Sequence, residues 1–175
     1  QEVAVQSLTI SSGELLIHPL RALCTAIADR NRLCTFNISD CVLSADAVTF
    51  LADWLKRSAR ITAFSAVNCN LADQATSLFD AVANHPTLTR LDLSGNRITY
   101  RSAAAIGKML QDTRNLKVLI VAKNRLRSRG AEDVFGGLAA NSSLKVLSLL
   151  HNELQFLGDD SLRALGGAVA SAVKR

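Results

Sequence analysis

The chain has 175 residues, of which 49% are hydrophobic and 20% are charged, so it can form a buried core and is not a disordered polypeptide. This length fits one domain or a stack of short repeats and leaves little room for two domains of full size. Twenty basic residues against fifteen acidic residues give a formal net charge of +5, which permits an acidic partner without requiring one.

Six segments follow one pattern, with apolar residues at the first, fourth, sixth and eleventh positions. They begin at residues 5, 33, 61, 88, 116 and 144 and read VQSLTISSGEL, LCTFNISDCVL, ITAFSAVNCNL, LTRLDLSGNRI, LKVLIVAKNRL and LKVLSLLHNEL. The starts are separated by 28, 28, 27, 28 and 28 residues. A nearly constant interval over almost the whole chain indicates a repeat protein rather than one globular domain.

Each repeat predicts one strand and one helix. Apolar and polar residues alternate within the segments, as from Leu91 to Ser94, which is strand periodicity. Apolar residues with helical spacing follow in the ranges 20–27, 48–55, 78–82, 103–110, 134–138 and 162–169. Ser44, Asp73 and Ser161 are candidate N-caps of these helices. Strands that are joined by helices predict a parallel sheet.

The pattern resembles the leucine-rich repeat family, and the period near 28 residues is similar to that of its ribonuclease-inhibitor-like subclass. The resemblance implies an α/β fold, a horseshoe-shaped solenoid of about six β-α repeats with a parallel concave sheet and convex helices. We expect residues 1–175 to form a single leucine-rich-repeat domain. Because neither end shows a capping motif, we expect this domain to be a fragment of a larger protein, with adjoining repeats or domains.

The ninth position of the repeats has a structural role in this family. An Asn there is implied to point inward and to bond backbone groups of the adjoining turn, which forms a ladder. The position holds Gly13 and then the expected ladder residues Cys41, Cys69, Asn96, Asn124 and Asn152. Because Cys is a weaker hydrogen-bonding group than Asn, the ladder should be strongest in the last three repeats. We interpret the two ladder cysteines as reduced, although a disulfide between them is geometrically conceivable.

The sequence contains no pattern that indicates catalysis. His18, His85 and His151 lie in different parts of different repeats, and the phosphate-binding and nucleophile-elbow motifs are absent. The pair Gly136-Gly137 falls within a predicted helix and is interpreted as allowing close helix packing. We therefore expect no enzyme activity, no metal and no cofactor. The cysteine usage and the lack of a membrane-spanning apolar run predict a cytoplasmic protein.

A candidate binding surface lies on the predicted concave face, where positions three, five and seven point to solvent between positions two and eight. In the last three repeats, the candidate residues are Arg90, Asp92, Lys117, Val118, Ile120, Lys123, Lys145, Val146, Ser148, Leu150 and His151. Val118, Ile120, Val146 and Leu150 form an apolar patch with a basic rim, the anatomy of a protein interface. We call these four residues the C-terminal concave patch. A neighbouring domain of the same protein is the alternative occupant.

Positive charge is concentrated beside this patch. Residues 86–130 contain ten basic and two acidic residues, a local charge of +8, whereas the remaining chain carries ten basic and thirteen acidic residues, or −3. Five arginines are expected in the loops from strand to helix and should cluster on one edge, here called the basic edge: Arg97, Arg101, Arg125, Arg127 and Arg129. An acidic protein could bind there, or the edge could simply be solvated. Nucleic acid is disfavoured because no aromatic residues interleave with the arginines.

Phe50 and Trp54 stand out on the second predicted helix because they are rotated away from its apolar stripe. They are expected to pack between neighbouring helices, and a convex contact is the alternative.

The leading functional hypothesis is a non-enzymatic protein–protein interaction module that binds a partner through the concave face and basic edge of its C-terminal repeats. Two alternatives remain open on the repeat resemblance alone. One is a regulator of a small GTPase, similar to the GTPase-activating protein of Ran. The other is the sensor domain of an intracellular nucleotide-binding immune receptor. Fold resemblance does not by itself decide among these functions.

Overall fold

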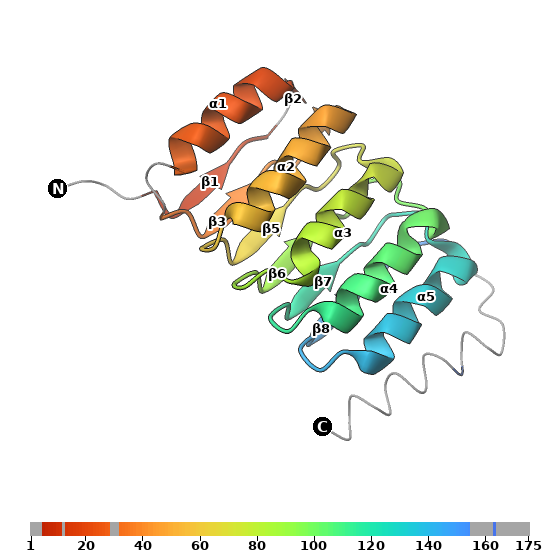
Figure 1. Ribbon diagram of the computed structural model, residues 1–175. Helices are drawn as coiled ribbons and strands as arrows, with labels where there is room; N and C mark the ends of the chain where they lie inside the picture. Colours follow the sequence, from red (N-terminus) through yellow and green to blue (C-terminus); the bar gives the residue numbers. More distant parts are fainter. Residues whose placement is uncertain (1–4, 12, 29–31, 155–162, 164–175) are drawn as a thin grey trace.

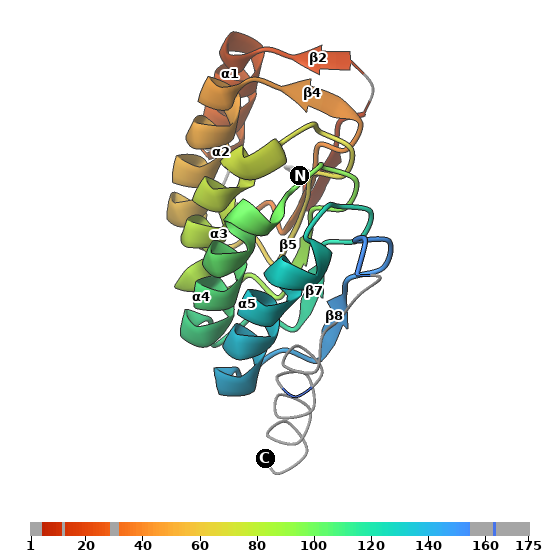
Figure 2. The same cartoon turned by 90° about the vertical axis from the view of Figure 1, so that its right-hand side faces the viewer.

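The chain folds into a curved stack of β-α repeats with a parallel sheet on one side and helices on the other (Figures 1 and 2). The computed structural model describes residues 5–11, 13–28, 32–154 and 163. Within these residues, the sheet order is β1 (Ser7–Thr9), β3 (Thr35–Asn37), β5 (Ala63–Ser65), β6 (Arg90–Asp92), β7 (Val118–Ile120) and β8 (Val146–Ser148). This architecture confirms the predicted α/β leucine-rich-repeat solenoid.

The sheet pairs equivalent positions of successive repeats. Arg90 of β6 is in register with Val118 of β7, which is in register with Val146 of β8, and every pair is parallel. The repeat interval read from the sequence therefore equals the sequence offset between hydrogen-bonded strands. Each strand has three residues because the chain turns away after one inward-facing side chain and its two outward-facing neighbours.

Helices cover the other face of the sheet (Figure 1). They are α1 (Ile17–Ala28), α2 (Ala45–Arg57), α3 (Thr76–Ala83), α4 (Ala103–Asp112) and α5 (Arg127–Ala140), with short 3-10 helices η1 (Ala72–Ala75) and η2 (Tyr100–Ser102) before α3 and α4. The helix predicted for 162–169 and its candidate cap Ser161 lie outside the described range. A second, two-stranded parallel sheet that the sequence did not predict pairs β2 (Gly13–Leu15) with β4 (Cys41–Leu43).

The caps show one correct and one wrong prediction. The Ser44 hydroxyl accepts from the backbone N–H of Ala47 at 3.3 Å, so it caps α2 as expected. Asp73 is not a cap, because it lies inside η1 and its carboxylate accepts hydrogen bonds from Thr99 and Ser102 of the next repeat. An extra 3-10 turn before α3 thus converts an expected cap into a contact between repeats.

The core lies between the sheet and the helices. In the fourth repeat, Leu88, Leu91, Leu93 and Ile98 are all at most 1% exposed, which matches the four apolar positions of the pattern. In the N-terminal half, two aromatic side chains also belong to the core. Phe36 and Phe64 occupy the fourth position on adjacent strands, are fully buried, and place their ring centroids 6.0 Å apart.

The ninth-position side chains run through the core beneath the turns. The Asn96 side-chain amide donates to the carbonyl of Ala66 at 2.6 Å, and its oxygen accepts from the backbone N–H of Cys69 at 2.8 Å. The Cys69 thiol instead donates to the carbonyl of Ile38 at 3.1 Å. Cys41 and Cys69 are both free thiols in this structure. A thiol sulfur accepts hydrogen bonds only weakly. The Asn side chain therefore both donates to and accepts from the preceding repeat, whereas the cysteines mainly donate to it.

Candidate functional site

The C-terminal concave patch is continuous across β7 and β8. Val118 lies in register beside Val146, and Ile120 lies beside Ser148. The backbone carbonyl of Leu150 accepts from the N–H of Lys123 at 2.7 Å, so Leu150 extends the same surface past the end of β8. Val146 is 49% exposed and Leu150 is 67% exposed, whereas the flanking positions of β7 are half-buried. The structure therefore brings the four apolar residues onto one surface and leaves the last repeat most accessible.

Basic residues flank the patch at both ends of the strands. Lys117 and Lys145 immediately precede β7 and β8 and lie side by side, because the N–H of Lys145 donates to the Lys117 carbonyl at 2.8 Å. Lys123 and His151 follow these strands and are exposed. Both adopt left-handed backbone angles, with φ of 53° and 57°. The equivalent position of other repeats holds Asp40, Asn68 and Gly95, residue types that adopt this conformation more readily.

Arg90 and Asp92 border the patch on β6. Register places Arg90 beside Val118 and Asp92 beside Ile120. The two side chains form an ion pair at 3.6 Å, and the Asp92 carboxylate also accepts from the Ser94 hydroxyl at 2.7 Å. Asp92 is thus largely engaged, while the Arg90 side chain remains 48% exposed. This border adds an accessible positive charge to the apolar surface.

The basic edge differs from its prediction in where the arginines lie. Arg97 and Arg125 are in loops, but Arg101 lies in η2, and Arg127 and Arg129 lie in the first turn of α5. The expectation that all five occupy loops is therefore wrong. Helix α5 begins at Arg127, before the range 134–138 in which apolar residues recur with helical spacing, and the short helix η2 precedes α4.

Three of these arginines converge on one small pocket. Arg101, Arg125 and Arg127 line a cavity of about 230 Å³ together with Asp73, Thr99 and Tyr100. Arg129 is not part of it, because its guanidinium carbon stacks 5.0 Å from the Tyr100 ring centroid. Arg127 pairs with Glu153 at 3.1 Å, and Arg97 donates to Asn70 at 3.2 Å.

Sequence reasoning missed the acidic member of this pocket. Partial burial raises the pKa of Asp73, but hydrogen bonds from Thr99 and Ser102 together with the charge of Arg101 outweigh it and hold that pKa below its ordinary value. The sequence offered one sign of this contact, because Asp73 lies one repeat before Arg101 and in the same part of the repeat. Asp73 therefore remains ionised and reduces the net positive charge of the edge locally.

The titratable groups elsewhere have structural environments. His85 is buried, its Nε2 lies 3.0 Å from the Leu55 carbonyl, and burial lowers its pKa. Burial raises the pKa of Cys24 to about 12 and that of Cys69 to about 11, so both thiols are protonated at neutral pH and are weak nucleophiles. No group of three His, Cys, Asp or Glu residues suited to a metal ion occurs among the residues described. None of the helices in that part of the chain is long and apolar enough to cross a membrane.

Comparison with known proteins identifies the repeat. A family model described as Leucine Rich repeat matches residues 84–107. The chain is 28% identical over 136 residues to leucine-rich repeat-containing protein 45 of Gallus gallus, covering 76% of this chain and 19% of that protein. It is 32% identical over 163 residues to the ribonuclease inhibitor of Mus musculus, covering 91% of this chain and 33% of that protein. The chain thus spans a third or less of these curated relatives.

Solved structures show the same fold. The tropomodulin C-terminal domain of Caenorhabditis elegans superposes with a TM-score of 0.64 at 16% identity, covering 71% of this chain and 77% of that chain. A structure described as leiomodin-1 actin-binding site 2 gives a TM-score of 0.65 at 14% identity, with coverage of 93% and 92%. With its in-register repeats and these relatives, the chain belongs to the leucine-rich repeat family and is of the ribonuclease-inhibitor-like type.

Proposed function

We propose that the chain is a non-catalytic protein-interaction module that holds an acidic segment of a protein partner on the C-terminal concave patch and the adjacent basic edge. The observation that carries the proposal is the exposure of Val146 and Leu150, 49% and 67%, at the end of the parallel sheet and beside basic side chains. An apolar centre with a polar, charged rim is the usual anatomy of a protein interface.

The turn residues beside the patch support this role. Lys123 and His151 occupy left-handed positions at which Gly, Asn or Asp would cost less conformational energy. A non-Gly residue in this conformation costs about 1–2 kcal/mol. Side chains that are kept at such a cost beside an exposed apolar surface are good candidates for partner contacts.

The charge distribution supports an acidic partner. Residues 86–130 carry a net charge of +8 while the rest of the chain is slightly acidic. The patch and the edge meet at the carboxyl ends of β7 and β8, where Lys123 is followed two residues later by Arg125. A protein is favoured over a nucleic acid because the Tyr100 ring on this edge is already covered by Arg129. Four free cysteines support an intracellular setting for this module.

The patch can be tested with Lys123→Glu combined with Val146→Asp. We expect the affinity for the partner to fall by about thirtyfold, because the apolar anchor Val146 becomes a carboxylate and the charge of Lys123 on the rim is reversed. The partner would be captured with the wild-type chain and its affinity measured by calorimetry. Ala63→Asp with Lys108→Glu makes the same charge change at an equivalent strand position of the third repeat and on α4, and it should bind normally. Unchanged affinity in the first variant would remove the patch from the proposal.

The basic edge should act mainly on the rate of association. Arg101→Glu with Arg125→Glu is expected to slow association by about tenfold at low salt, with the difference shrinking at high salt as charges are screened. Stopped-flow measurements over a range of salt concentrations would show this. Lys56→Glu with Lys108→Glu changes the net charge equally on the helical side and is the matched control. Equal slowing in both variants would mean that net charge matters and the edge does not.

A further inference from the structure

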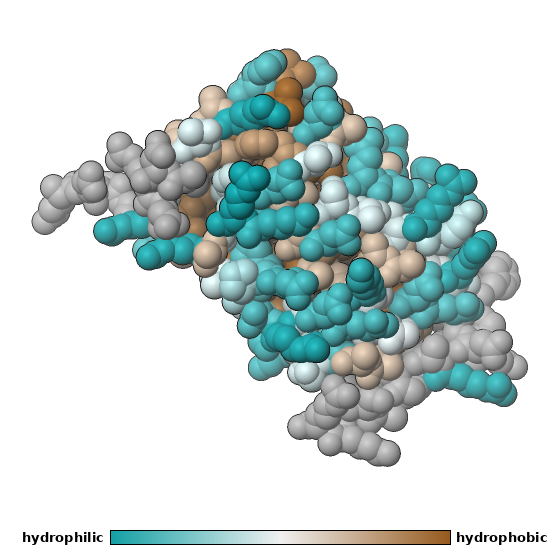
Figure 3. Space-filling view, viewed as in Figure 1, coloured by the Kyte–Doolittle hydropathy of each residue, from teal (hydrophilic) through white to brown (hydrophobic). Residues whose placement is uncertain are grey.

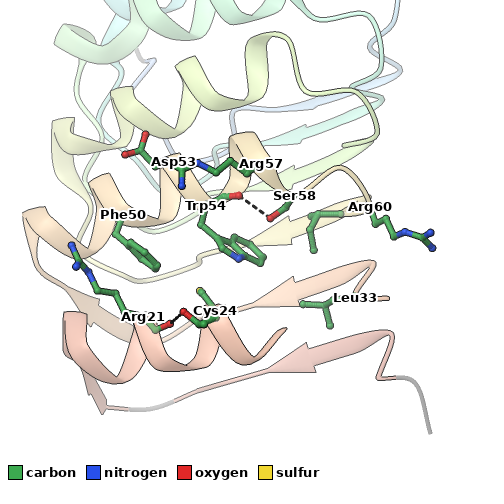
Figure 4. Close-up of a pocket in the computed structure, with 11 residues that line it drawn as sticks. Arg21, Cys24, Leu33, Phe50, Asp53, Trp54, Arg57, Ser58 and Arg60 are labelled. Atoms are coloured by element: carbon green, nitrogen blue, oxygen red, sulfur yellow. Dashed lines mark hydrogen bonds between the residues drawn. The ribbon is translucent and has the colours of Figure 1, made fainter. Parts of the chain in front are cut away.

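A second surface with binding character lies far from the concave patch, between α1 and α2. A groove of about 570 Å³ opens there, near the carboxyl ends of the two helices (Figure 4). Its volume is within the range of pockets that enclose a ligand or several side chains of a peptide. Cys24, Leu33 and Ile61 are buried residues that form its apolar floor. Figure 3 shows apolar surface among the hydrophilic side chains over this part of the helical face.

Two aromatic residues form one wall of the groove. Phe50 and Trp54 extend from α2 toward α1 and are only half-buried (Figure 4). The Trp54 ring packs edge-on against the buried Phe36 ring, with centroids 5.2 Å apart, so the core side of the Trp54 ring is supported by Phe36. The expectation that these aromatics lie between helices holds, but α1 does not fill the space in front of them. An accessible, rigidly held Trp beside Phe is an energetically favourable anchor point for a partner.

Arginines surround the aromatic wall. Arg21 lies across the groove with its guanidinium carbon 5.3 Å from the Phe50 ring centroid. Arg57 and Arg60 stand at the end of α2 and are exposed. Within the residues that the structure describes, these three arginines form no ion pair, and Asp53 is the acidic residue in the lining. The groove therefore combines an apolar interior with a rim on which three arginines outnumber one aspartate among the described residues.

We propose that this groove binds an acidic peptide segment of a partner protein. One large apolar side chain of the segment inserts against Phe50 and Trp54, and flanking carboxylates face Arg21, Arg57 and Arg60. The charge complementarity selects an acidic segment, because Arg pairs bidentately with carboxylates. The apolar floor selects a segment with an aromatic or aliphatic anchor. The site is on the helical side of the first two repeats and is independent of the concave patch of the last two.

Trp54 is the single Trp of the chain, so its fluorescence reports directly on the groove. The probe is the Trp-free peptide Glu-Asp-Phe-Leu-Asp-Glu with blocked ends. We expect a saturable change in Trp54 emission with a dissociation constant of about 0.1 mM. Arg57→Glu with Arg60→Glu should weaken binding by about tenfold, and the exposure of both side chains keeps the fold intact. A peptide with Ser in place of Phe and Leu should give no saturable change.

The controls separate this site from the concave one. Arg101→Glu with Arg125→Glu carries the same charge change at the basic edge and should bind the peptide as the wild type does. Three results would overturn the proposal: no emission change up to about 1 mM peptide, equal binding of the Ser-substituted peptide, or equal weakening by both double variants. A dimer that dissociates in the Arg57→Glu, Arg60→Glu variant would also overturn it, because the occupant would then be a second copy of the chain.

Discussion

Asn124→Ala is expected to lower the free energy of unfolding by about 3–5 kcal/mol. The Asn124 oxygen accepts from the backbone N–H groups of Asn96 and Ile98, both at 3.0 Å. Its amide nitrogen donates to the carbonyls of Leu93 at 3.0 Å and Val121 at 2.9 Å. Alanine removes the partner of the buried N–H groups of Asn96 and Ile98 and of the Leu93 carbonyl, whereas the Val121 carbonyl still accepts from the Asn152 amide at 2.8 Å. Each buried group that is left unpaired costs about 1–3 kcal/mol. Urea denaturation followed by circular dichroism would measure the loss.

Cys69→Ala is the matched control for this prediction, because Cys69 holds the same repeat position and is equally buried. Its thiol donates to the carbonyl of Ile38, and its sulfur is a weaker acceptor than the side-chain oxygen of Asn124. We expect a loss of about 1 kcal/mol. Equal losses in the two variants would show that the ladder amides contribute only their packing. A smaller loss in Asn124→Ala would contradict the ladder argument itself.

Most of the fold could be predicted from the repeat period of the sequence. A nearly constant offset between equivalent apolar segments determines both the strand register and the burial of residues such as Leu91 and Leu119. The pairing of β2 with β4 could not be read in the same way. These two short strands follow β1 and β3 in the turns that lead to the helices, and no alternation of apolar and polar residues marks them in the sequence. Asp73 was likewise misread, because one additional 3-10 turn changes which neighbour its carboxylate contacts.

The two candidate surfaces differ in how far the sequence could locate them. Exposure of Val146 and Leu150 follows from strand alternation within a repeat, so a pattern suffices to place them on the concave face. The groove beside Trp54 depends on the distance between α1 and α2, which is set by side chains of two separate repeats. Periodicity indicates that Phe50 and Trp54 leave the apolar stripe of α2, but it does not indicate whether the next helix covers them.

Gly137→Ala is expected to destabilise the chain by about 2–3 kcal/mol, although Ala normally favours a helix. Gly137 of α5 packs directly against the backbone of Gly107 in α4, and an added Cβ would overlap with that backbone. A backbone obstacle cannot rotate away as a side chain can, so the two helices must separate. Thermal and urea unfolding would both report the loss.

The preceding residue provides an unusually close control, because Gly136 is in the same helix and an added Cβ there meets no atom within 4 Å. Gly136→Ala should stabilise the chain by about 0.5–1 kcal/mol, since it removes the entropic cost of Gly in a helix. Opposite signs at neighbouring positions would separate helix packing from helix propensity. If both substitutions stabilised the chain, α4 and α5 would have to tolerate a wider spacing, and the close glycine contact would not be needed for the stack.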